Sequence, residues 1–244
     1  MTEYVYGIVA EATRPPSEPG IGGAPVRLIE GGGAAALVSE VAADSVRLGR
    51  EDALAHARVL ESALSHGTVL PMRFGVVMDG ADDVRRRLLA EHDGELRRQL
   101  EEFAGKVEVN LRVLYEENAL MRQVLANEPE AARLRESIRG KPEDATYFER
   151  IRLGELVAHT VERIREADAQ AIVDALAPLT VGVSIADPAH ERMVLAASFL
   201  IERARLDAFD RKLDEIAAGR ADSMRFKYTG PLPPHSFVEL SGSS

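Results

Sequence analysis

The sequence predicts an α+β protein made of two halves. Strand-like and helix-like segments alternate along all 244 residues, and the order strand, strand, helix, strand occurs twice, once on each side of Ala104 and Gly105. The composition, 45% apolar and 29% charged, is that of a globular chain with a sizeable core. We therefore predict a domain over residues 1–104 and a second over residues 105–244. Their element order resembles the βαββαβ, ferredoxin-like arrangement.

The first half has the pattern of a ferredoxin-like unit whose first helix is replaced by a loop. It opens on the aromatic and β-branched run Tyr4 to Val9, and a Pro- and Gly-rich loop follows it. Three glycines at 31–33 predict a hairpin, and Gly67 stands where the glycine that ends a helix is expected. Pro71 places its strand at a sheet edge or a strand start. The expected elements are strands at 4–9, 26–29 and 36–41, a helix at 51–66, an extended stretch at 68–78 and a helix at 82–103.

The second half predicts a βαββαβ unit with an enlarged first crossover. The alternating run VEVNLRVLY at 107–115 is typical of a strand, and apolar residues at helical spacing continue from Pro142 to Ala177. A straight helix of that length would span about 50 Å. We expect part of it to project, or to pack against shorter helices as a coiled-coil-like hairpin. The expected elements are a strand at 107–115, helices at 116–127, 129–138 and 142–177, strands at 179–185 and 193–201, a helix at 204–218 and a strand at 224–228. The apolar run at 193–201 also fits a helix.

Charge and composition exclude several classes of protein. The net charge of −10 argues against a nucleic-acid partner, and the arginines at 85–87 and 97–98 lie among acidic residues, as on a solvated helix face. There is no cysteine, which excludes disulfides and thiol chemistry. No apolar stretch approaches the roughly 20 residues that span a bilayer, and the N-terminus lacks the pattern of a signal peptide. We expect a cytoplasmic protein that binds no lipid membrane.

No catalytic or ligand-binding pattern emerges from the residues. None of the six histidines has the spacing of a metal site, no GxSxG sequence occurs, and the glycine clusters lack the strand and helix context of a phosphate loop. We predict no catalytic residues, no metal and no cofactor. Carboxylates are abundant, but the sequence alone assigns no acid–base pair among them, so an enzyme that uses carboxylates is a hypothesis without specific support.

Two segments stand out from this background. One is VLPMRFG at 69–75, which a simple interpretation makes an edge strand with Arg73 facing solvent. The other is KYTGPLPPHSFVEL at 227–240, which we interpret as a last strand followed by a stiff arm. We predict that the arm packs across the N-terminal half, that it fastens the two halves, and that Phe237 is buried.

Three motifs carry a resemblance to a known family. YVYGIV at 4–9, VLPMRFG at 69–75 and YTGPLPPHSF at 228–237 are similar to motifs of the gas vesicle synthesis proteins of the GvpF/GvpL type, and they extend over the whole chain. His235 stands where the family usually has a tyrosine, and Val76 and Met78 replace a common Thr and Phe. The candidate structural or partner-binding residues are Pro71, Arg73, Phe74, Gly75, Gly230, Pro231, Pro233, Pro234 and Phe237.

The resemblance implies a fold and a function. It implies a modified ferredoxin-like domain followed by a part with coiled-coil-like helices. It also implies a non-enzymatic accessory protein, associated with gas vesicles, that binds the small hydrophobic shell protein and other accessory proteins as a chaperone or a minor shell component. The alternative function is that of a small-molecule-binding regulatory protein built on ferredoxin-like modules. Self-association, and the choice between the F and L types, stay open.

Overall fold

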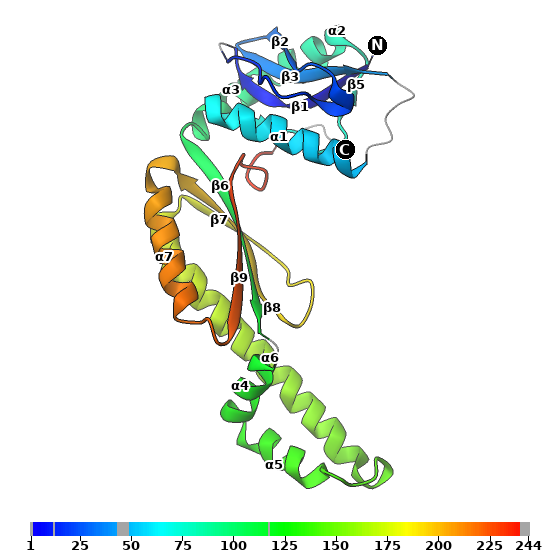
Figure 1. Cartoon of the computed structure of the whole chain (residues 1–244), viewed down its shortest axis with the longest axis vertical. Helices are drawn as coiled ribbons and strands as arrows, with labels where there is room; N and C mark the ends of the chain where they lie inside the picture. The colour runs from blue at the N-terminus through cyan, green and yellow to red at the C-terminus, as the bar shows by residue number, and fades with distance from the viewer. Residues whose placement is uncertain (1, 12, 43–48, 117, 240–244) are drawn as a thin grey trace. The chain divides into compact units, whose positions relative to one another are not determined.

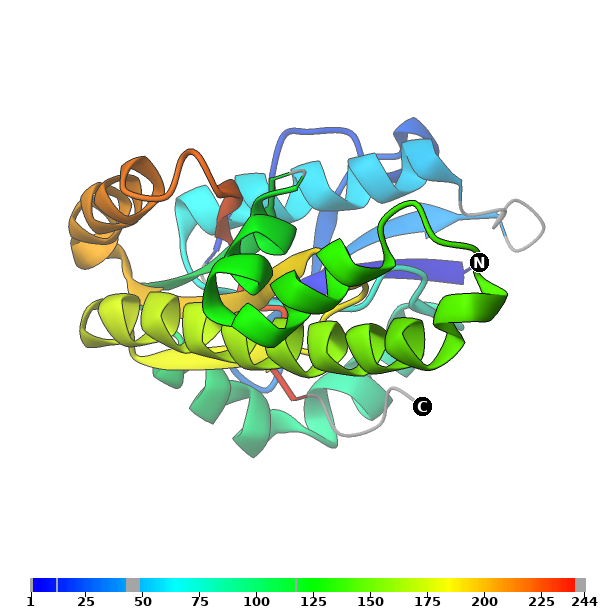
Figure 2. The ribbon, with the colours of Figure 1, turned by 90° about the horizontal axis from the view of Figure 1, so that it is seen from below.

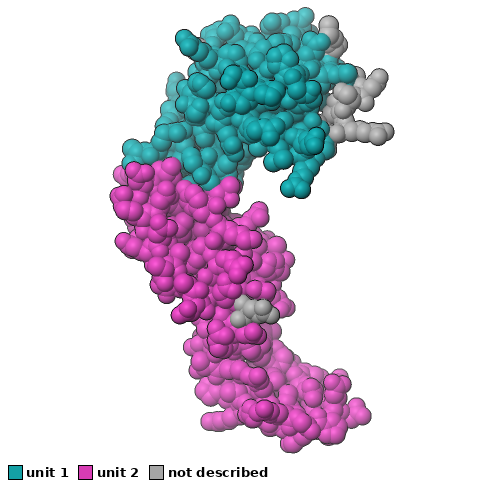
Figure 3. Space-filling model, viewed as in Figure 1, with its two compact units in different colours: residues 1–109, 200–204, 230–244 teal, residues 110–199, 205–229 magenta. Residues whose placement is uncertain are grey.

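The computed structural model describes residues 2–11, 13–42, 49–116 and 118–239 of the chain (Figure 1). The last residue of the predicted arm, Leu240, and one residue of the helix predicted at 116–127 lie outside these ranges. The chain forms two compact units. Unit 1 comprises residues 1–109, 200–204 and 230–244, and unit 2 comprises residues 110–199 and 205–229 (Figure 3). Two sheets and a long helix confirm the predicted α+β class.

Unit 1 is built on a five-stranded antiparallel sheet. Its strand order is β2-β3-β1-β4, and β5 also pairs with β1. This is the order expected of a ferredoxin-like sheet, and a loop with one 3-10 turn at Ile21–Gly23 occupies the place of the first helix. The strands are β1 (Thr2–Ala10), β2 (Arg27–Gly31), β3 (Ala34–Val41), β4 (Val69–Pro71) and β5 (Val77–Met78). The helical segments are α1 (Arg50–His66), α2 (Ala81–Asp83), the π-helical segment η3 (Val84–Ala90) and α3 (Asp93–Glu102).

Helices cover both faces of this sheet. His56 and Leu60 on α1 pack on one face, while Leu88, Leu89 and Leu96 join the apolar cluster on the other. A β-bulge between Val5 and Gly7 shifts the register of β1 against β3. Because the bulge interrupts the alternation of side chains between the two faces of the strand, the consecutive residues Tyr6 and Gly7 both face α1.

Two local expectations for unit 1 are wrong. The helix predicted at 82–103 is interrupted at Glu91 and His92, and its first part is π-helical, with the Glu91 amide donating to the Arg86 carbonyl at 3.0 Å. The wider turn allows the adjacent Leu88 and Leu89 both to enter the core. Gly67 does follow the last residue of α1, but it is extended, with φ of 165°, so it forms no left-handed cap.

Unit 2 contains most of a four-stranded sheet with the order β7-β8-β6-β9. This again is the order of a ferredoxin-like sheet, with helices α4 to α6 inserted between its first two strands. The strands are β6 (Lys106–Tyr115), β7 (Gly182–Ala186), β8 (Met193–Glu202) and β9 (Met224–Leu232). The helices are α4 (Ala119–Asn127), α5 (Pro129–Ile138), α6 (Tyr147–Leu176) and α7 (Leu206–Ala218), with short 3-10 segments η4 (Asp144–Thr146), η5 (Ala177–Leu179) and η6 (Arg203–Arg205).

The long helix α6 organises unit 2. Its 30 residues correspond to about 45 Å of helix, and α4 and α5 pack alongside its first half (Figures 1 and 2). Its second half packs on the sheet through Ile164, Ile172 and Leu176, and Asp168 accepts a hydrogen bond from the Tyr115 hydroxyl at 2.8 Å. That the α4–α6 group forms a coiled coil stays a prediction.

Strand β8 decides between the two interpretations of residues 193–201, and strand β9 is longer than predicted. The apolar run at 193–201 is strand β8, not a helix, and it lies between two other strands, as continuous apolar runs do. The last strand, β9, runs four residues further than predicted and includes Gly230 and Pro231. A proline is tolerated there because β9 is at the sheet edge, where an outward N–H has no partner to lose.

Candidate functional site

Two of the singled-out segments meet at one pocket of unit 1. The pocket has a volume of about 410 Å³. Arg73 and Phe74 line it from the segment that follows β4, and Leu232, Pro233 and His235 line it from the C-terminal segment. Helix α1 completes the wall with His56, Ala57, Leu60 and Glu61. Arg73 and Leu232, about 160 positions apart in the sequence, therefore line the same pocket.

The pocket wall rests on a hydrogen-bonded aromatic cluster. The Tyr4 hydroxyl accepts the Gly75 amide at 3.0 Å and bonds Nδ1 of His56 at 2.8 Å. The His56 ring meets the rings of Tyr4 and Phe74 edge-on, at centroid distances of 5.7 and 5.8 Å. Gly75 has φ of 99°, a left-handed conformation that a side chain would disfavour, so glycine lets this backbone turn toward Tyr4.

Electrostatics keep this cluster neutral. Burial raises the pKa of the Tyr4 hydroxyl to about 12. Burial, and secondarily the nearby His235, lower the pKa of His56 to about 4. At neutral pH both rings are uncharged, and neither titrates near pH 7, where a general acid or base is most effective. The arrangement supports packing rather than proton transfer.

The predicted residues of the first motif therefore divide into buried and exposed ones. Pro71 is buried in β4, opposite Gly7 of β1, and β4 ends the strand order as the proline suggested. Arg73 is exposed, as predicted, and Phe74 is 41% exposed at the pocket. Arg73 and Phe74 are the two members of this group that a partner can reach.

The predicted residues of the C-terminal motif fix the tail to unit 1. A Cβ at Gly230 would lie 3.0–3.3 Å from Val109 and the Glu108 carbonyl, so glycine permits a close backbone approach. Pro231 is exposed at the edge of β9, while Pro233 and Pro234 are buried. Phe237 packs on the apolar cluster of unit 1 but is only half-buried, which corrects the prediction of a buried ring.

Two polar anchors hold the residues that follow. The carboxylate of Glu108, which is 0% exposed, accepts the Ser236 amide at 2.7 Å and the Ser236 hydroxyl at 2.8 Å. The Gln99 side chain donates to the Glu239 carbonyl at 2.6 Å and accepts the Glu239 amide at 3.3 Å. Sequence reasoning missed Glu108, Gln99 and His56. Glu108 occupies a polar position of the alternating run at 107–115, so the pattern gave no sign that it is buried.

Exposed apolar side chains gather elsewhere, in unit 2. Among the described residues, large apolar side chains that are strongly exposed belong mostly to this unit. They are Met121, Tyr147, Phe148, Ile151, Val181, Ile185 and Tyr228. Tyr147 and Phe148 begin α6, where their rings contact each other and are 59% and 79% exposed. An exposed pair of contacting aromatic rings on a protein surface indicates an interaction site.

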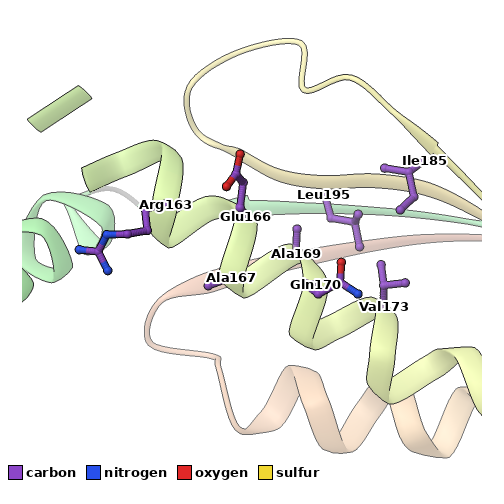
Figure 4. A pocket seen from close by; sticks show the side chains of 8 residues that line it. All are labelled: Arg163, Glu166, Ala167, Ala169, Gln170, Val173, Ile185 and Leu195. Carbon is purple, nitrogen blue, oxygen red and sulfur yellow. The ribbon is translucent and has the colours of Figure 1, made fainter. Parts of the chain in front are cut away.

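A groove lies between α6 and the β7–β8 hairpin of the same unit (Figure 4). Its volume is about 590 Å³. Ala169 and Val173 of α6 face Ile185 of β7 and Leu195 of β8 across it, and Arg163 and Glu166 lie toward one end. The floor of the groove is apolar, and no group of three or more metal-ligating side chains occurs anywhere in the described ranges. The same ranges contain no helix that is long and apolar enough to span a membrane.

Comparison with known proteins gives one consistent result. The family model described as "Gas vesicle synthesis protein GvpL/GvpF" matches residues 3–239. Gas vesicle protein F of Streptomyces sp. (strain CB03234) is 36% identical over 98% of this chain and 100% of its own length. Gas vesicle protein F of Nostoc sp. (strain PCC 7120) is 26% identical over 84% of each chain.

A solved structure agrees with these relatives. The crystal structure of the gas vesicle protein GvpF from Anabaena sp. PCC7120 superposes with a TM-score of 0.85 at 26% identity, over 98% of this chain and 99% of that one. The family model, the Streptomyces relative and the Anabaena structure each match nearly the whole sequence. The chain therefore belongs to the GvpL/GvpF family of gas vesicle synthesis proteins.

Proposed function

We propose that this protein is a non-enzymatic accessory factor of gas vesicle assembly, which binds the hydrophobic shell protein and other accessory proteins. The observation that carries the proposal is the concentration of exposed apolar side chains in unit 2, above all Tyr147 and Phe148 at the start of α6 and Ile185 on β7. Membership of a gas vesicle family supplies the context in which such a surface has a partner.

The physical reasoning concerns a subunit with an exposed apolar face. Each Å² of apolar surface that stays in water costs about 25 cal/mol of free energy relative to burial. A shell subunit with such a face therefore aggregates before it reaches the growing shell. A helper with complementary apolar side chains covers that face. Its own net charge of −10 keeps the complex dispersed by mutual repulsion.

The chemistry of the unit 1 pocket also favours a binding role. The pocket of unit 1 is lined mainly by aromatic, apolar and proline side chains, with Arg73 and Glu61 as its charged members. Burial lowers the pKa of its His56 to about 4, so this ring is uncharged at pH 7. We place the protein in the cytoplasm, at gas vesicles or their precursors. The alternative, a regulatory protein that binds a small molecule, would require a metabolite that raises the melting temperature of the purified chain.

The test combines a genetic and a biochemical measurement. Deletion of the gene, in a strain without a second copy, should abolish floating cells, and the intact gene should restore them. In vitro, the purified chain should lower the light scattering that follows dilution of the shell protein from denaturant, and it should be retained by immobilised shell protein. Normal vesicles in the deletion strain, or scattering unchanged by equimolar protein, would refute the proposal.

A further inference from the structure

The edge of the unit 2 sheet at β7 differs from the other sheet edges in the described part of the chain. A sheet edge exposes backbone N–H and C=O groups that invite pairing, and proteins block it with charges, prolines or very short strands. The opposite edge, β9, carries Arg225, Lys227 and Pro231. In unit 1, β2 carries two charged residues, and β4 is three residues long and ends on a proline.

Strand β7 has none of these protections. Its sequence is GVSIA, without charge or proline, and β8 is its one neighbour among the strands of the described ranges. Val181, just before the strand, is 47% exposed, and Ile185 is 59% exposed. Because side chains alternate along a strand, residues 181, 183 and 185 share one face. That face is the one on which Ile185 borders the groove with α6 (Figure 4).

We propose that β7 is the docking edge for an extended, apolar segment of the gas vesicle shell protein. This segment adds to the sheet of unit 2 as a fifth strand. This inference rests on the proposed function and specifies where and how the partner binds. The unpaired backbone groups of β7 match an extended chain, because a helix satisfies its backbone internally. Every second side chain of the added strand would enter the groove beside Val173 and Ala169, so apolar residues are required at alternate positions.

The size of the edge favours a partner strand over a second copy of this chain. Five residues of β-strand are about 17 Å long. A two-fold pairing of β7 with itself would bury far less than the roughly 1,200 Å² of a stable dimer. A partner strand has more to gain, because its side chains also fill a groove of about 590 Å³ that β7 itself leaves open.

The first test introduces a charge on the edge. Ile185→Lys places an ammonium group at the mouth of the groove, and Val77→Lys is the matched control, since Val77 is a 41% exposed apolar residue on the short strand β5 of unit 1. Both positions are exposed, so both variants should keep the circular dichroism and melting temperature of the parent. The assay is suppression of aggregation when the gas vesicle shell protein is diluted from denaturant. We expect Ile185→Lys to need at least tenfold more protein for half suppression, and Val77→Lys to equal the parent.

The second test uses the lack of cysteine in the chain. Ile185→Cys and Lys227→Cys each carry one thiol, on β7 and on the opposite edge β9, to which a benzophenone maleimide is attached. Photolysis with the shell protein should give a cross-linked product from position 185 and little from position 227. Backbone amides at 182–186 should also exchange more slowly in the complex.

The outcomes separate the two proposals. A parent protein that fails to suppress aggregation removes the proposed function, and the docking edge with it. A parent that suppresses aggregation while Ile185→Lys does so equally well, or while position 227 cross-links as strongly as position 185, overturns the docking edge alone. A free protein that is dimeric and becomes monomeric on Ile185→Lys would show that a second copy occupies β7, which also overturns the inference.

Discussion

Ser236→Ala tests whether the C-terminal segment is held by Glu108. The Ser236 hydroxyl donates to a carboxylate oxygen at 2.8 Å, and the carboxylate is fully buried. A hydrogen bond to a charged acceptor contributes about 1.5–3 kcal/mol, and here the acceptor cannot turn to water when its donor is lost. We expect the free energy of unfolding of unit 1 to fall by about 2 kcal/mol. For a chain of this size the melting temperature should fall by about 4–8 °C.

The assay is urea unfolding followed by circular dichroism, in a double-mutant cycle with Glu108→Gln. The amide oxygen of glutamine still accepts one of the two hydrogen bonds, so the coupling energy between the positions should be about 1–2 kcal/mol. Ser137→Ala is the control, because Ser137 is exposed and its hydroxyl bonds only the Leu134 carbonyl within α5. It should change stability by less than about 0.5 kcal/mol. Equal effects of the two serine substitutions, or a coupling energy near zero, would refute the anchoring role of Glu108.

Three further predictions concern unit 1. Gly7→Ala puts a Cβ 2.8 Å from the Leu70 carbonyl, so it should lower stability by about 1–3 kcal/mol in the same urea titration, whereas Gly94→Ala, which meets nothing within 4 Å, should not. His56 has a folded pKa of about 4, below its ordinary 6.5, so its contribution is complete above pH 6.5 and is lost as the pH falls toward 4. At pH 4 the loss should approach about 3 kcal/mol, and His56→Phe should flatten the dependence of melting temperature on pH between 6.5 and 4. Truncation after Thr229 removes two buried prolines and Phe237, so the shortened chain should melt at lower temperature and be cleaved faster by protease in unit 1; an unchanged melting temperature would mean that the segment serves a partner instead.

Elements specified by local pattern were predicted correctly. The alternating run of β6, the glycine-centred hairpin of β2 and β3, and the helical periodicity of α6 each depend on neighbours in sequence, so the residues themselves contain the information. The strand order of both sheets followed, because βαββαβ connections leave few alternatives.

Features that depend on distant partners could not be predicted. The π-helical turn at η3 brings two adjacent leucines into a core that also contains residues of β1, β3 and α3, so it depends on contacts that are distant in sequence. Glu108 and Ser236 are 128 positions apart, and Gln99 and Glu239 are 140 apart. No local pattern distinguishes such a glutamate from an exposed one. The pairing of Tyr4 with Gly75 is likewise visible only once β1 and the segment after β4 are adjacent.

The residues that revealed the family have different tasks from the residues proposed to bind a partner. Tyr4, Gly75, Gly230 and Pro233 each meet a specific atom or fill a specific space in unit 1, and few other side chains satisfy those constraints. Motifs of this kind are recognisable because their chemistry is demanding. A docking edge constrains the sequence less, because many uncharged sequences that favour β-strands and have an apolar face can form one. GVSIA is one such sequence. Such an edge becomes visible only in the structure, where the strand order shows that β7 has a neighbour on one side and exposed apolar side chains beside the other.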